Sequence, residues 1–219
     1  MEKSKHEGGH RDRAAESRHR LLLAGMAQFA EKGYDGASVR GIVGSVGCSV
    51  PAISSYFGGK EGLAKAIVAE LKRTIVLPAA TDAKEIGSDL AWRVAVKRFV
   101  QHVVEVFNAE EEPNCYFAAL YRHESAHFHG KKVTLHEEIV KPLFCQLEKL
   151  IALGVANRSP IEVRLWTLAL WNNVLAYALK HPDVVAEDIP EGIEPRLFRE
   201  TNVDFMVDKC IRDLRFTAA

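Results

Sequence analysis

The sequence predicts an all-α protein, and three observations carry that prediction. Apolar residues recur every three or four positions over most of the 219-residue chain, which is the spacing of one helix face. No stretch shows the strict apolar–polar alternation that is typical of half-buried strands. Ser, Gly and Pro stand between the apolar stretches, where helices begin and end. We therefore expect an N-terminal three-helix helix–turn–helix domain and a C-terminal helical bundle.

Residues 1–17 are predicted to be a flexible tail. They are rich in charged side chains and His, hold Gly8-Gly9, and carry too little apolar surface to fold alone. The three-helix domain is then expected over residues 18–64, and the bundle over residues 65–219.

The first two helices are marked by local signals. One is expected over about 17–32, because Leu22, Met26 and Phe29 share a face, and Gly33 is a good stop. The second follows Ser38, whose hydroxyl can cap free backbone amides, and ends at Gly47.

The third and fourth helices follow directly. Ser49 is the next cap, Pro51 fits the first helical turn, and the third helix ends near Gly58. The fourth begins at about Lys60 and ends before Pro78. A helix–turn–helix of this kind places one short helix in a DNA major groove.

The C-terminal part is predicted to hold longer helices that also form a dimer contact. Apolar positions recur over 96–107 and over 140–151, each as one stripe. Residues 160–180 are apolar nearly all round, so that helix must be buried on two sides. A second copy of the chain is the simplest cover. We expect a homodimer formed by helices 160–180 and 195–215.

Charge and composition restrict the setting. The net charge is zero, but residues 1–73 hold 12 Lys and Arg against 8 Asp and Glu, and the rest of the chain holds 17 against 21. A basic front weakly favours a nucleic-acid partner. A charged N-terminus and the lack of a long apolar run predict a cytoplasmic protein with no membrane contact. Four widely spaced cysteines fit free thiols.

Residues 20–67 resemble the N-terminal domain of the TetR family of bacterial transcription regulators. The matching stretches, in order, are Gln28–Tyr34, Ser38–Ile42, Gly47–Ser49 and Ile53–Leu63. Pro51–Leu63 is similar to the variant found in CecR-like members, and Leu120–Glu124 and Ile139–Pro142 faintly resemble that subgroup's rear domain. The resemblance implies a repressor that is released from a palindromic double-stranded operator when a small molecule enters the rear bundle. It implies neither an enzymatic activity nor a cofactor.

Positions within this segment then suggest which residues meet DNA. Ile53 and Phe57 should anchor the third helix, so that its other side faces base edges and phosphates. Lys60 stands where free helix amides and a cation together favour a phosphate. The predicted DNA-binding residues are Arg40, Ser49, Val50, Ala52, Ser54, Ser55, Tyr56 and Lys60.

The predicted effector-binding residues combine aromatic surface with a polar tip, or lie as amides in an apolar helix. They are Trp92, His102, Tyr116, Tyr121, Trp166 and Asn172.

Two alternatives stay open at this stage. His123-Glu124-Ser125-Ala126-His127 matches H-E-x-x-H, in which His123 and His127 could share a zinc ion with Glu124 as base, in a metallohydrolase or a metal-sensing regulator. The third ligand of the extended motif is missing, because Val133 stands at its position. The other alternative is a helical interaction protein without operator binding. It is suggested by Ser54, where the family usually has Tyr, and by Gly41 and Gly44 in the second helix.

Overall fold

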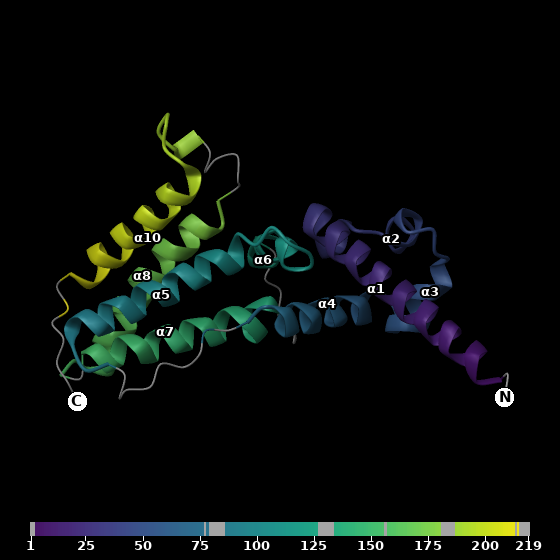
Figure 1. Cartoon of the computed structure of the whole chain (residues 1–219), viewed down its shortest axis with the longest axis horizontal. Coiled ribbons are helices and arrows are strands. Elements are labelled where there is room, and N and C mark those ends of the chain that lie inside the picture. Colours follow the sequence, from purple (N-terminus) through teal and green to yellow (C-terminus); the bar gives the residue numbers. More distant parts are fainter. Residues whose placement is uncertain are drawn as a thin grey trace. The chain divides into compact units, whose positions relative to one another are not determined.

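Helices account for every regular element of the part of the chain that the structure describes, which confirms the predicted fold class (Figure 1). The structure is a computed structural model, and it describes residues 3–76, 78, 86–126, 134–155, 157–180, 187–212 and 214. In chain order the elements are α1 (Lys3–Gly36), α2 (Val39–Ser45), α3 (Val50–Phe57), α4 (Lys60–Thr74), α5 (Asp89–Phe107), η2 (Asn114–Tyr116), α6 (Phe117–Ala126), η3 (His136–Val140), α7 (Lys141–Gly154), α8 (Pro160–Ala178) and α10 (Pro195–Ile211).

The chain forms two compact units, and each draws on two separate parts of the sequence. The first unit combines Met1–Ile75 with Glu110–Glu138, and the second combines Val76–Ala109 with Ile139–Ala219. The first therefore contains α1 to α4 together with α6, and the second contains α5, α7, α8 and α10. The predicted ranges 1–17, 18–64 and 65–219 describe a functional division, and they stay a prediction.

The core of the first unit is built around α1. This helix packs against α2, α4 and α6. Leu21 and Met26 of α1, Ile42 of α2, Ile53 of α3 and Leu63 of α4 are all almost fully buried. One apolar cluster thus holds the three short helices and their support together.

Helix α1 is longer than expected at its start. The helix start predicted near Ser17 differs from the structure, which continues the helix back to Lys3. This first stretch contains many good helix formers such as Lys, Glu, Arg and Ala, and it needs no apolar face to continue an existing helix. The predicted stop is confirmed, because Gly33 has φ 71° and interrupts the regular helix.

The second unit is a helical bundle in which α5 packs against α7, α8 and α10. Trp92 of α5 is fully buried, and its indole nitrogen donates a hydrogen bond to the Leu150 carbonyl oxygen at 2.9 Å. Ser159 and Glu162 form a capping box that fixes the start of α8. Among the residues that the structure describes, no helix is both long and apolar enough to cross a membrane.

Candidate nucleic-acid interface

The turn between α2 and α3 is fixed by backbone geometry and by two buried anchors. Ile42 and Val43 bury the inner side of α2. Gly47 has φ 68°, a left-handed conformation that glycine adopts without strain. The Cys48 amide then donates to the Val43 carbonyl oxygen at 2.9 Å, which closes the end of α2. The direction in which α3 leaves the turn is therefore set.

Helix α3 exposes one side and buries Ile53 on the other, as the sequence predicted, whereas Phe57, the second predicted anchor, is only partly buried. Ile53 is 1% exposed and faces the core, whereas Val50 is 45% exposed. Ser49, Ser54 and Ser55 are exposed, and Ala52 and Tyr56 are partly exposed. Hydroxyls and a small apolar side chain thus lie on a side of α3 that is free for base edges and phosphates, within this chain.

The start of α4 is held against the end of α3 by a glycine. A Cβ atom on Gly62 would lie 1.6 Å from the Phe57 carbonyl oxygen, so no other residue fits here without a backbone shift. Gly59, with φ 116°, makes the sharp connection that precedes α4. This contact places Lys60, the first residue of α4, beside the exposed end of α3.

Lys60 is partly buried against aromatic rings. Its Nζ lies 4.5 Å from the Tyr34 ring centroid and 6.0 Å from that of Phe29. These cation–π contacts restrict the side chain at the α4 N-terminus. A preordered ammonium at a helix start is a suitable phosphate ligand.

Arg40, the remaining predicted contact, is exposed near the start of α2. Two further arginines of α1, which were not predicted from the sequence, lie near these residues. Arg18 is exposed, and its guanidinium carbon lies 5.0 Å from the Phe57 ring centroid at the end of α3. Arg20 donates to the Val46 carbonyl oxygen at 2.7 Å and so ties α1 to the end of α2. The sequence signal that could have indicated them is their position: both are basic residues in the helical turn just before Leu21, the first apolar residue of this helix face.

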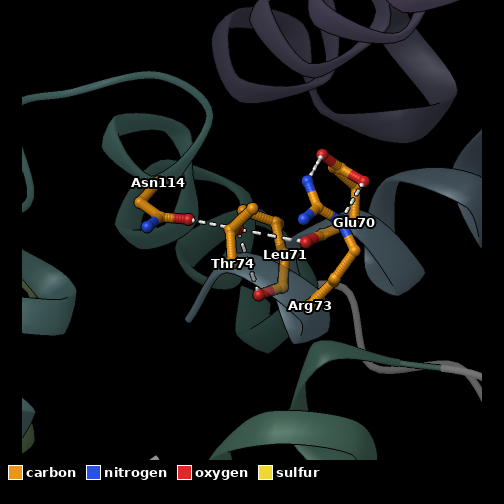
Figure 2. Close-up of polar contacts among 5 residues, drawn as sticks. All are labelled: Glu70, Leu71, Arg73, Thr74 and Asn114. Carbon is orange, nitrogen blue, oxygen red and sulfur yellow. Dashed lines mark hydrogen bonds and ion pairs between the residues drawn. The ribbon is translucent and has the colours of Figure 1, made fainter. Parts of the chain in front are cut away.

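The far end of α4 is bonded to η2 within the same unit (Figure 2). The Thr74 hydroxyl lies 2.6 Å from the side-chain oxygen of Asn114 and 3.0 Å from the Glu70 carbonyl oxygen. In the same turn, the guanidinium of Arg73, the residue before Thr74, donates two hydrogen bonds to the Glu70 carboxylate, which lowers the pKa of Glu70. The last turn of α4 is thereby fastened to the segment that leads into α6.

The H-E-x-x-H pattern is explained by contacts within the first unit. The His123 Nε2 donates to the Ala30 carbonyl oxygen at 3.0 Å, so α6 is bonded to the end of α1. The Glu124 carboxylate accepts hydrogen bonds from the backbone amides of Leu135 and His136, both at 2.8 Å, and so caps the turn that leads into η3. His127 lies outside the described residues. Within those residues no three His, Cys, Asp or Glu side chains gather as metal ligands would.

The six predicted effector-binding residues are divided between the two units. Tyr116 and Tyr121 belong to the first: the Tyr116 hydroxyl bonds to Glu112, which raises its pKa to about 12, and Tyr121 is buried next to His136. Trp92, His102, Trp166 and Asn172 belong to the second.

These four differ in their surroundings. Trp92 is a core residue, and the His102 Nε2 lies 2.6 Å from the Val76 carbonyl oxygen. Trp166 lines a groove between α8 and α10, and Asn172 is exposed on α8. The assignment of these residues to an effector remains a prediction.

Comparison with known proteins points to one family. The family model described as bacterial regulatory proteins, tetR family, matches residues 21–67. The chain is 26% identical over 175 residues to the HTH-type transcriptional dual regulator CecR of Shigella flexneri, which covers 75% of this chain and 76% of that protein.

Solved structures share the fold. A TetR transcriptional regulator from Agrobacterium tumefaciens aligns with a TM-score of 0.62 at 12% identity, over 92% of this chain and 94% of that one. The TetR-family regulator PfmR from Thermus thermophilus aligns with a TM-score of 0.57 at 20% identity, over 90% of this chain and 99% of that one. Residues 21–67 thus match the DNA-binding domain of the tetR family of bacterial regulatory proteins, and the chain as a whole is similar to TetR-family regulators in sequence and in fold.

Proposed function

We propose that the chain is a homodimeric repressor that binds a palindromic operator and is released from it by a small molecule. The exposed side of α3, with Val50, Ser54 and Ser55, reads bases in the major groove. Lys60 and Arg18, which both lie near the C-terminal end of α3, bind phosphates. The observation that carries the proposal is the rigid placement of α3 between the Gly47 turn and the Gly62 contact.

Two copies of the helix–turn–helix, called the two heads below, are needed to read a palindrome. The second unit offers a surface through which two chains can pair. Ile161, Leu165 and Leu168 of α8 are 68%, 59% and 38% exposed, and Leu197 and Phe205 of α10 are 55% and 60% exposed. These exposed apolar side chains on two adjacent helices support dimerisation, in which the face packs against the same face of a second chain.

Release by a small molecule follows from linkage. An effector that binds one arrangement of the two heads better than another shifts the dimer toward it, and the affinity for the operator falls accordingly. The α4 helix and the α6 segment fastened to it are the elements of the first unit that would carry such a change.

The test is binding of the full-length protein to the DNA upstream of its own coding sequence, followed by fluorescence anisotropy at several salt concentrations. We expect specific binding that weakens steeply with salt. Lys60→Ala should lower the slope of log K against log salt by about one unit per head, because one phosphate contact is lost.

Lys65→Ala is the matched control, because Lys65 lies five residues further along α4 and is exposed and paired with Glu61 at 2.7 Å. The control should bind with the wild-type salt slope. Absence of sequence-preferring binding by the wild-type protein, at low salt and at concentrations where it is dimeric, would refute the proposed function.

A further inference from the structure

The turn at Gly33 connects α6 to Lys60 through direct contacts, all within the first unit. Gly33 has φ 71° and interrupts the regular course of α1. It contacts His123 of α6, a residue of the H-E-x-x-H pattern. The residue that follows it, Tyr34, contacts Lys60 at the start of α4.

The ring of His123 is packed directly against this turn. Its Nε2 donates to the carbonyl oxygen of Ala30, in the last regular turn before Gly33, at 3.0 Å. A Cβ atom on Gly33 would lie 3.1 Å from the His123 Nδ1, so the absence of a side chain at Gly33 leaves room for the ring. His123 therefore holds the backbone at the point where the chain turns toward Tyr34.

The Tyr34 ring lies at the surface, but it is supported by the core. Its centroid is 5.5 Å from that of Phe29, and the two planes are tilted by 56°. Phe29 is 4% exposed, whereas Tyr34 is partly exposed. Aromatic rings attract each other at this separation and tilt. One edge of the Tyr34 ring is thus fixed by a buried neighbour, while part of the ring stays accessible.

The ammonium group of Lys60 lies over this ring. Its Nζ is 4.5 Å from the Tyr34 centroid, within the range of about 6 Å over which an aromatic face attracts a cation. Among the described residues Lys60 forms no ion pair with a carboxylate, so its charge is available to an anion. A lysine that is already held in one conformation loses less side-chain entropy when it binds a phosphate.

From these contacts we propose that Tyr34 is a positioning residue for Lys60, and that His123 sets the position of Tyr34 through the Gly33 turn. A phosphate ligand beside the end of α3 is thereby placed under the control of α6. This control of a DNA contact depends on the function proposed above. The contact between ring and ammonium does not, because it can be measured without DNA.

The first measurement is NMR spectroscopy of the full-length protein without DNA. The ring current of Tyr34 should shift the Hε protons of Lys60 upfield from those of the other lysines, and Lys60→Arg assigns the signal by its loss. Tyr34→Phe should keep the upfield shift, because the ring remains. Tyr34→Leu should abolish the shift, and His123→Ala should reduce it.

The second measurement is fluorescence anisotropy with the upstream DNA, and with a duplex of unrelated sequence at low salt. Both probes apply, since a phosphate contact does not depend on sequence. Tyr34→Leu should raise the Kd for the upstream DNA about tenfold, whereas Tyr34→Phe should bind like the wild type. His123→Ala should raise this Kd about threefold, and His123→Gln, which keeps a donor for the Ala30 carbonyl, should raise it less.

A double-mutant cycle separates positioning from a general structural role. In a Lys60→Ala background, Tyr34→Leu and His123→Ala should cause no further loss of affinity. In a Lys65→Ala background, both should cost as much as they do in the wild type. Urea denaturation of each variant checks that the fold is kept.

Three results would overturn the proposed positioning. They are a Lys60 signal without an upfield shift in the wild type, equal weakening by Tyr34→Phe and Tyr34→Leu, and full effects of Tyr34→Leu and His123→Ala in the Lys60→Ala background. A wild-type protein that prefers no sequence, yet shows the NMR shift and the coupling on the unrelated duplex, would refute the repressor and retain the positioning. The two failures are therefore distinguishable.

Discussion

At the scale of single residues, the helix–turn–helix and the start of α4 depend on positions that have no room for a side chain, rather than on strong polar contacts. Gly62 allows α4 to touch the last turn of α3, and this close approach is visible only in three dimensions. The residues at the neighbouring helix boundaries are local signals, although of the two predicted serine caps only Ser38 makes a capping hydrogen bond and Ser49 does not. For this reason the sequence predicted Ser38, Gly47, Ser49 and Gly58 as helix boundaries, but it offered no reason for Gly62.

Gly62→Ala should destabilise the protein by about 3 kcal/mol, because the new methyl group overlaps the Phe57 carbonyl oxygen. Gly44→Ala is the matched control. A Cβ on Gly44 meets nothing within 4 Å, so the control should gain about 0.5–1 kcal/mol from helix propensity. Urea denaturation of both variants measures the difference, and equal effects would contradict the close approach.

The Glu70–Arg73 pair should make a pH-dependent contribution to stability. The hydrogen bonds from Arg73 lower the pKa of Glu70 from its ordinary 4.5 in the folded protein. Its contribution is therefore present above about pH 4.5 and is lost as the pH falls through the folded pKa. The stability difference between wild type and Glu70→Gln should shrink over that range in denaturant titrations. A difference that stays constant from neutral to acid pH would argue against the pair.

At the scale of elements, α6 is the main finding that local sequence patterns could not supply. His123 meets Ala30, which is 93 positions earlier in the chain, and Glu124 meets amides 11 and 12 positions later. The same two residues produced the metal-site alternative, because spacing along a helix is all that a motif records. Similarly, the start of α1 was missed because a polar helix shows no apolar period.

Glu124→Ala should lower the free energy of unfolding by about 1–3 kcal/mol, because two partly buried hydrogen bonds from backbone amides to a charged acceptor are lost. Glu105→Ala, at an exposed position of α5, should change it by less than about 0.5 kcal/mol. Thermal unfolding of both variants provides the comparison. If Glu124→Ala were as stable as the control, the capping role assigned to Glu124 would be wrong.

At the scale of the whole molecule, the apolar faces of α8 and α10 set the predicted assembly. The sequence indicated two-sided burial of residues 160–180, and the exposed Leu165 agrees with a face that one chain leaves uncovered. Which residues pair across a dimer could not be read from the sequence, since periodicity gives a face but not a partner.

Leu165→Glu should convert the proposed dimer to monomers and weaken operator binding at least about 100-fold, because the two heads would no longer bind as one. Leu90→Glu is the control: Leu90 is 71% exposed near the start of α5 and is not part of the face proposed for pairing. Sedimentation velocity and anisotropy measure both effects. A Leu165→Glu protein that remains dimeric would exclude this face as the pairing surface.

The discontinuous first unit has a practical consequence for protein engineering. Because Glu110–Glu138 belongs to the same compact unit as Met1–Ile75, we expect a hybrid regulator made by joining only the first 75 residues to a foreign sensor to lack part of that unit. Such a fusion would lack the buried residues Phe117, Leu120 and Tyr121 of that unit. The apolar surface that they cover would then be exposed on the fused segment. A working chimera would have to carry both pieces, and its recipient would need an insertion site for the second.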